Sequence, residues 1–150
     1  MSDPVSVRYL PIREAVCDLL EGYAALSEVK EIAREEESFG AMAATKFPAL
    51  GVFFAQVAGE ELAQWAAMRR DHRYKLEVRV AVRSLESARV CEDLLFSYVE
   101  AVEDALRSEP TLGGLVRSMS AEMVQRGKRK VGEYWHGEAG FIVICEKSVN

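Results

Sequence analysis

The sequence predicts an α+β fold in which two amphipathic helices pack on a mostly antiparallel sheet, within one domain that spans residues 1–150. Apolar and polar residues alternate over Tyr74–Arg83, which is typical of a strand with one buried face. A helical apolar stripe follows at once, and two β-prone apolar runs, Phe47–Ala55 and Ala139–Cys145, flank this strand and helix. A chain of 150 residues can bury one core without disulfides or a structural metal.

The strand and helix between residues 74 and 114 are the best defined part of the chain. The apolar side chains of the strand should face the core: Tyr74, Leu76, Val78, Val80 and Val82. The helix should pack on them through residues three or four apart: Ala88, Cys91, Leu95, Tyr98, Val102 and Leu106. Ser84 is expected to cap this helix, and Glu86 to lie near the positive end of its dipole. Pro110 and the Gly113–Gly114 pair predict the turn that ends it.

The first third of the chain predicts one helix and several less regular segments. Residues 1–9 are interpreted as a flexible lead-in, and Pro11 as part of the first turn of a helix. The apolar stripe of this helix comprises Ile12, Ala15, Val16, Leu19, Leu20 and Tyr23. Residues 27–37 fit either a short edge strand or a continuation of the helix, and small residues at about 38–46 predict a mobile surface loop.

Four segments complete the prediction. The run Phe47–Ala55 is too short for a buried helix and predicts a core strand. Residues 59–73 predict an arm or loop, in which Trp65 is interpreted as a core or oligomer anchor. Residues 115–125 fit a helix or a strand. Because the β-prone run Ala139–Cys145 follows a plausible hairpin turn at residues 136–138, the C-terminal part is predicted to be a β-meander.

Composition and charge exclude several classes of protein. The formal net charge of -5 argues against general binding to nucleic acid or to an anionic membrane, because both are polyanions. No apolar run approaches the roughly 20 residues of a membrane helix, and we expect no signal peptide. The three cysteines, Cys17, Cys91 and Cys145, are interpreted as reduced core residues of a protein that stays in the cytosol.

The sequence offers no pattern of catalytic or cofactor-binding residues. His72 and His136 belong to no metal-binding spacing, and each is interpreted as a surface or structural residue. The Gly113–Gly114 pair lacks the strand, turn and helix order of a phosphate-binding loop. We therefore expect a protein that is not an enzyme and that uses no cofactor or metal.

The segment from Arg126 to Lys130 is basic in an otherwise acidic chain. Its positive residues are Arg126, Lys128, Arg129 and Lys130. It is consistent with a solubilising hairpin loop, or with a docking patch for an acidic protein or for nucleic acid, of which a protein is favoured. Together with Trp65, these four residues are the candidate partner interface.

Several phrases of the sequence resemble the tail terminator, or tail-completion, proteins of long-tailed bacteriophages. They are FPALGVF, HRYKLEVRVAVRS, VEDALRSEP, TLGGLV and the closing FIVICEK, in an order of elements that covers most of the chain from about Pro11. The resemblance implies an α+β subunit that forms a six-membered ring at the end of the tail tube, stops growth of the tube and joins the tail to the head.

The same resemblance implies the partners and the location. The partners would be further copies of the chain, a tail tube protein and a head-completion or connector protein. DNA would pass through the ring without specific binding, and no membrane would be involved. The ring would be part of the virion tail and would assemble in the bacterial cytoplasm. The family has no catalytic residues. Another phage neck or head-completion protein, or a small non-enzymatic interaction domain, is the alternative, and an enzyme is a third.

Overall fold

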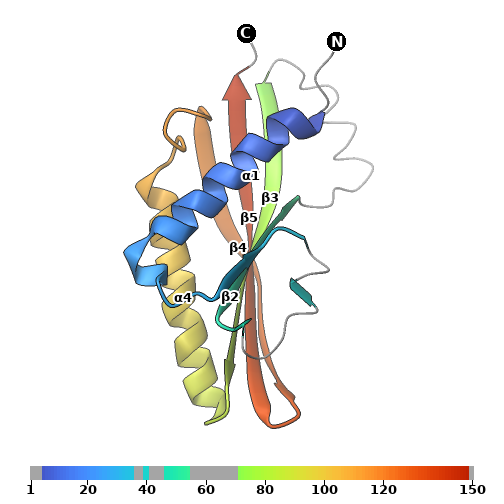
Figure 1. Ribbon diagram of the computed structural model, residues 1–150, viewed down its shortest axis with the longest axis vertical. Helices are drawn as coiled ribbons and strands as arrows, with labels where there is room; N and C mark the ends of the chain where they lie inside the picture. Colours follow the sequence, from blue (N-terminus) through green and yellow to red (C-terminus); the bar gives the residue numbers. More distant parts are fainter. Residues whose placement is uncertain (1–4, 36–38, 41–45, 55–70, 149–150) are drawn as a thin grey trace.

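The computed structural model describes residues 5–35, 39–40, 46–54 and 71–148, and it has the α+β architecture that the sequence predicts (Figure 1). Two helices lie on one face of a five-stranded sheet. The elements in chain order are α1 (Val5–Gly22), the short 3-10 helix η1 (Ala24–Leu26), β1 (Glu31–Ala33), β2 (Ala49–Phe54), β3 (Asp71–Ser84), α4 (Ala88–Ser108), β4 (Ser118–Val131) and β5 (Tyr134–Ser148).

The strands of the sheet lie in the order β1-β2-β3-β5-β4. Strands β1 and β2 are parallel, and the other three pairs are antiparallel. The predicted antiparallel pairing of the C-terminal strands is confirmed, because β4 and β5 form a hairpin, and of these two strands β5 lies beside β3. Polarity explains this order, because β5 carries the apolar run Phe141–Cys145, whereas β4 carries charges that suit a sheet edge.

The central strand and helix match the prediction closely. All five predicted core side chains of β3 are buried, and Cys91, Leu95, Val102 and Leu106 of α4 pack with them in one hydrophobic cluster. Tyr98 packs at the margin of this cluster and is only partly buried. The opposite face of α4 is polar and exposed: Arg89, Asp93, Ser97, Glu100 and Asp104. This helix thus anchors the sheet, as its stripe predicts.

The cap of α4 differs from the prediction. Ser87 is the N-cap residue, and its Oγ accepts a hydrogen bond from the backbone N–H of Val90 at 3.1 Å. Ser84 is the last residue of β3, where its Oγ accepts from the backbone N–H of Glu86 at 3.1 Å. Both serines suit the capping role, but the chain needs a short turn after β3 before the helix can lie back across the sheet. Glu86 therefore precedes the helix.

The N-terminal helix is longer than predicted. It begins at Val5, so that residues 5–9 are helical and only residues 1–4 of the predicted lead-in lie outside the described part. Pro11 lies inside the helix and not in its first turn. Proline removes one helical hydrogen bond, and burial of the residues that follow compensates: Ile12, Val16, Cys17 and Leu20 are fully buried. Helix α1 crosses the sheet in front of β3 and β5 (Figure 1).

The two segments for which the sequence left alternatives open, residues 27–37 and 115–125, each contain part or all of a strand. In residues 27–37, Glu31–Ala33 forms the short edge strand β1, which was one of the two alternatives. The predicted core strand is β2, whose alternate residues face the two sides of the sheet. Leu50 and Val52 pack under the helices, while Ala49 and Phe53 belong to a small second cluster with Ala33, Phe39 and Ala81. Within residues 115–125, strand β4 begins at Ser118.

The turn of the C-terminal hairpin lies four residues before the predicted one. Residues 136–138 are part of β5 and not a turn, and the chain reverses at Gly132 and Glu133, where Gly132 has a φ of 61°. A two-residue turn with positive φ matches the twist of a hairpin. Gly137 serves another purpose: a Cβ there would lie 3.2 Å from Sγ of Cys91, so this glycine lets α4 approach the sheet. The basic segment 126–130 is consequently strand and not loop.

Candidate partner interface

Strand β4 is one edge of the sheet among the described residues. It is 14 residues long and pairs with β5 along one side only. An unpaired strand edge presents a row of backbone N–H and C=O groups that another strand can bind, so proteins usually protect such edges with charges or bulges. The two halves of β4 differ in this respect.

The C-terminal half of β4 is protected against strand pairing. It carries the four cations of residues 126–130, and a β-bulge separates it from the N-terminal half between Met123 and Gln125. The N-terminal half, Ser118–Met123, contains one charge, Glu122. Met123 and the bulge residue Val124 are 39% and 55% exposed. Only the N-terminal half therefore has the features of an edge that can accept another strand.

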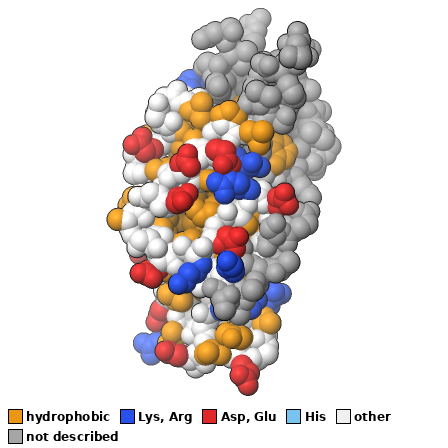
Figure 2. All heavy atoms as spheres, viewed as in Figure 1, with side chains coloured by type: hydrophobic (Ala, Val, Ile, Leu, Met, Phe, Trp, Pro, Cys, Tyr) orange, Lys and Arg blue, Asp and Glu red, His pale blue; other side chains and the backbone are white. Residues whose placement is uncertain are grey.

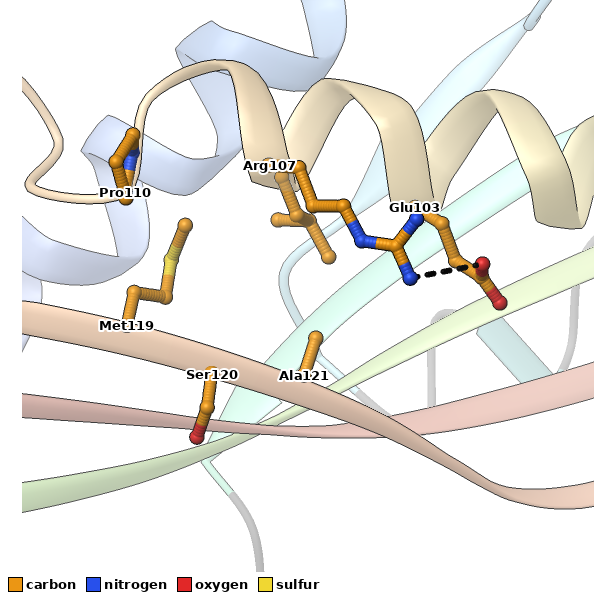
Figure 3. Close-up of a pocket in the computed structure, with 7 residues that line it drawn as sticks. Glu103, Arg107, Pro110, Met119, Ser120 and Ala121 are labelled. Atoms are coloured by element: carbon orange, nitrogen blue, oxygen red, sulfur yellow. Dashed lines mark ion pairs between the residues drawn. The ribbon is translucent and has the colours of Figure 1, made fainter.

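A groove of about 260 Å³ lies beside this half, between the end of α4 and β4 (Figure 3). Its apolar lining comes from Leu106 and Pro110 on one side and from Met119 and Ala121 on the other. Met119 and Ala121 rise from β4 toward the helix, whereas Ser120 points to the opposite face (Figure 3). An ion pair between Glu103 and Arg107, with 3.5 Å between Nη2 and Oε2, lies at the rim.

The cations of the basic segment point to two different faces, because side chains alternate along a strand. On the side of α4, Nζ of Lys128 lies 2.6 Å from Oε2 of Glu92, which lowers the pKa of the Glu92 carboxyl. The guanidinium of Arg126 lies 4.7 Å from the ring centroid of Phe96, and Nζ of Lys130 lies 5.8 Å from that of Trp135. Contrary to the sequence interpretation, these residues do not form one loop-borne patch.

Arg129 lies on the opposite face of the sheet, in register with His136 of β5. Both residues line a second hollow of about 200 Å³ together with Arg126, Gly127, Lys128 and Glu138. Figure 2 shows the face that bears α1, where acidic and basic side chains of the described residues are interspersed.

His136 is the centre of a polar network that the sequence did not reveal. It is 6% exposed and is the one buried polar side chain among the described residues. Nε of Arg83 donates a hydrogen bond to its Nδ1 at 3.1 Å. A guanidinium nitrogen can only donate, so the ring hydrogen lies on Nε2, which donates to Oε2 of Glu138 at 3.2 Å. The ring of Phe47 covers His136 edge-on at a centroid distance of 5.5 Å. His136 is a structural residue with satisfied hydrogen bonds.

The same network also affects the ionisation of the Glu138 carboxyl. The hydrogen bond from His136, and the nearby guanidinium groups of Arg79 and Arg129, lower the pKa of this carboxyl despite its partial burial. Nη1 of Arg79 is 3.9 Å from Oε1 of Glu138, and Nε of Arg79 bonds Glu77 at 2.6 Å. Sequence reasoning missed this network because it assigned residues 136–138 to a turn. Strand alternation would have placed His136 and Glu138 on one face.

The other residues singled out in the sequence have simpler outcomes. Cys17, Cys91 and Cys145 are buried and unpaired, as predicted. Burial raises the pKa of the Cys17 thiol to about 11 and that of Cys145 to about 12, so both stay protonated and unreactive. Trp65 lies outside the described residues, as does most of the predicted loop at 38–46 and arm at 59–73.

Neither the residues at this site nor the comparison with known proteins identifies the class of protein to which the chain belongs. Among the described residues, no group of three or more potential ligands is arranged to hold a metal ion, and no helix is long and apolar enough to cross a membrane. No protein-family model matches the chain, and no curated protein matches it. The geometry therefore defines an α+β domain with a half-open sheet edge, a groove beside that edge and a basic region further along the same strand.

Proposed function

We propose that this protein is a structural subunit of a bacteriophage tail, of the tail terminator type. Six copies of the chain form a closed ring. This ring caps the tail tube, ends its polymerisation and joins the tail to the head. The proposal rests on the resemblance of the sequence to that family. The observation that carries it further is the N-terminal half of β4, an unprotected strand edge beside an apolar groove.

A ring accounts for this edge in physical terms. Identical subunits that meet through two different surfaces form a closed ring when the rotation between them closes. In the proposed ring, Ser118–Met123 is part of one of these surfaces, and a neighbouring subunit covers the backbone edge and fills the groove. The accessible apolar lining of Pro110, Met119 and Ala121 then leaves water on assembly, which favours association.

The remaining surfaces of the ring meet other proteins. We propose that the basic half of β4 docks a tail tube protein or a head connector protein, since oppositely charged surfaces speed and orient association. With a net charge of -5 on each subunit, DNA passes through the ring without binding, because like charges repel. The assembled ring belongs to the virion tail, and it forms in the cytoplasm of the bacterial host.

Electron microscopy of tails assembled with and without this protein tests the proposal. Tails formed without it should be longer and more variable than normal and should lack heads, and added purified protein should restore a uniform length. Tails of normal length joined to heads in its absence would exclude the terminator role. A normal tail length with unjoined heads would instead favour another neck or head-completion protein.

A further inference from the structure

We propose that the hollow beside Gly127 binds a carboxylate side chain of a protein partner, with Arg129 as its main contact. This inference rests on the proposed function, because it specifies the chemistry by which the basic half of β4 recognises its partner. It concerns a single hollow on the face of the sheet opposite the helices. Four observations support it: an unengaged cation, an open space, a partly neutralised floor and a size that suits one side chain.

Arg129 is the unengaged cation. Of the four basic residues in this part of β4, Lys128 pairs with Glu92, and Arg126 and Lys130 lie over aromatic rings. Within the described residues, the guanidinium of Arg129 has no hydrogen bond, ion pair or ring contact. A guanidinium carries fixed donors that match the two oxygens of a carboxylate. Arg129 is therefore available for an incoming acid.

The open space is at Gly127. This residue is in register with Glu138, and a Cβ built on it would meet no atom within 4 Å. Gly127 and Arg129 both line a hollow of about 200 Å³, and Gly127 has no side chain to fill it. Pockets for small molecules usually measure about 300–1,000 Å³. The hollow is thus smaller than a typical ligand pocket and suits the end of an acidic side chain.

The floor of the hollow does not repel an acid as strongly as its composition suggests. Glu138 contributes a carboxylate, but His136 donates a hydrogen bond to it and Arg79 lies 3.9 Å away. The hydrogen bond stabilises the carboxylate, and the guanidinium of Arg79 offsets part of its charge. Arg129 lies near enough to Glu138 to lower the pKa of its carboxyl, but it forms no ion pair with it, so its guanidinium donors stay open to an incoming anion.

A protein carboxylate fits these observations better than nucleic acid does. Binding to nucleic acid strengthens with the number of phosphates that cations neutralise. Here three of the four cations are already engaged, and the whole chain carries a charge of -5 that repels a polyanion at long range. One aspartate or glutamate on a partner surface needs only one free guanidinium and a small hollow.

Amide NMR spectra of the ¹⁵N-labelled protein test this inference with three probes: a short blocked peptide that contains glutamates, the same peptide with glutamines, and tetrathymidylate. The glutamate peptide should shift the amide signals of Gly127, Arg129 and Glu138 in a saturable manner. Arg129→Gln should weaken this binding by about tenfold, the effect of one charge-assisted contact. The matched control is Arg89→Gln, which removes the same charge from an exposed site on α4 and should bind normally.

Three results would overturn the inference: equal binding of the glutamine peptide, unchanged affinity in Arg129→Gln, or tighter binding of tetrathymidylate than of the glutamate peptide. The ring is tested separately. Arg129→Gln should leave the oligomeric state unchanged, because Arg129 lies outside the proposed subunit contact. A protein that forms rings but fails the peptide test would refute the carboxylate site alone, and one that binds the peptide but forms no ring would refute the proposed ring alone.

Discussion

At the scale of single residues, Leu95 connects the helix to the sheet. Its side chain is 2% exposed, and its Cδ2 would lie 3.4 Å from a Cβ built on Gly137, so the helix and β5 are in close contact at this point. Leu95→Ala should destabilise the protein by about 2–5 kcal/mol through lost burial and the cavity left behind. Urea denaturation measures this difference, with the exposed Asp93→Ala as the control on the same helix. An unfolding midpoint equal to that of the wild type would mean that Leu95 does not face the core.

A second prediction at the scale of residues concerns Glu138 and the pH dependence of protein stability. The hydrogen bond from His136 lowers the pKa of Glu138 in the folded protein below its ordinary value of 4.5. A carboxyl with a lowered folded-state pKa stabilises the protein above the unfolded-state pKa, and this contribution is lost as pH falls through the folded-state value. Wild-type stability should consequently fall from about pH 5 downward, and Glu138→Gln should reduce this fall.

Thermal unfolding of the two proteins at a series of pH values between about 5 and 3 measures the effect. The exposed Glu100→Gln is the control, since its side chain lies on the outer face of α4. Parallel pH profiles for wild type and Glu138→Gln would contradict the assignment of Glu138 to an ion-paired network.

At the scale of elements, long periodic segments were predicted from the sequence and local junctions were not. Strand β3 and helix α4 each carry an unbroken apolar period, which is enough to place their buried faces. Ser84 and Ser87 both suit the start of α4, and Gly132 and Gly137 both suit the turn of the hairpin. In each case tertiary packing decided between the two residues. The polar network of His136 joins residues 53 positions apart, so no local pattern contained it.

The prediction at the scale of elements concerns the edge strand β4 and its part in assembly. Ala121→Lys places a charge in the groove and on the unprotected half of the edge, where strand pairing would bury it at high cost. The variant should remain folded, because Ala121 is exposed, but should form far less oligomer than the wild type. Ser97→Lys adds the same charge to the exposed face of α4 and should assemble normally. Size-exclusion chromatography with light scattering compares the three proteins. Equal assembly of Ala121→Lys and wild type would remove β4 from the proposed contact.

At the scale of the whole molecule, the two halves of β4 are assigned to different tasks: subunit contact for Ser118–Met123 and partner docking for the basic half. Changing Arg126, Lys128, Arg129 and Lys130 together to Ser should leave the ring intact and weaken the attachment of tail to head. Raising the salt concentration should weaken wild-type attachment in the same way, because salt screens exposed charges. Counting joined particles by electron microscopy measures both effects. Joining at the wild-type rate at low and high salt would place the docking surface elsewhere.

The ring is the central claim, and native mass spectrometry of the purified protein over a range of concentrations tests it most directly. The account predicts one dominant closed species with six times the mass of the chain, without a ladder of larger open assemblies, because a closed ring leaves no free contact surface. Ala121→Lys should shift this species to monomer. A protein that stays monomeric at every concentration, or that forms only dimers, would contradict the account.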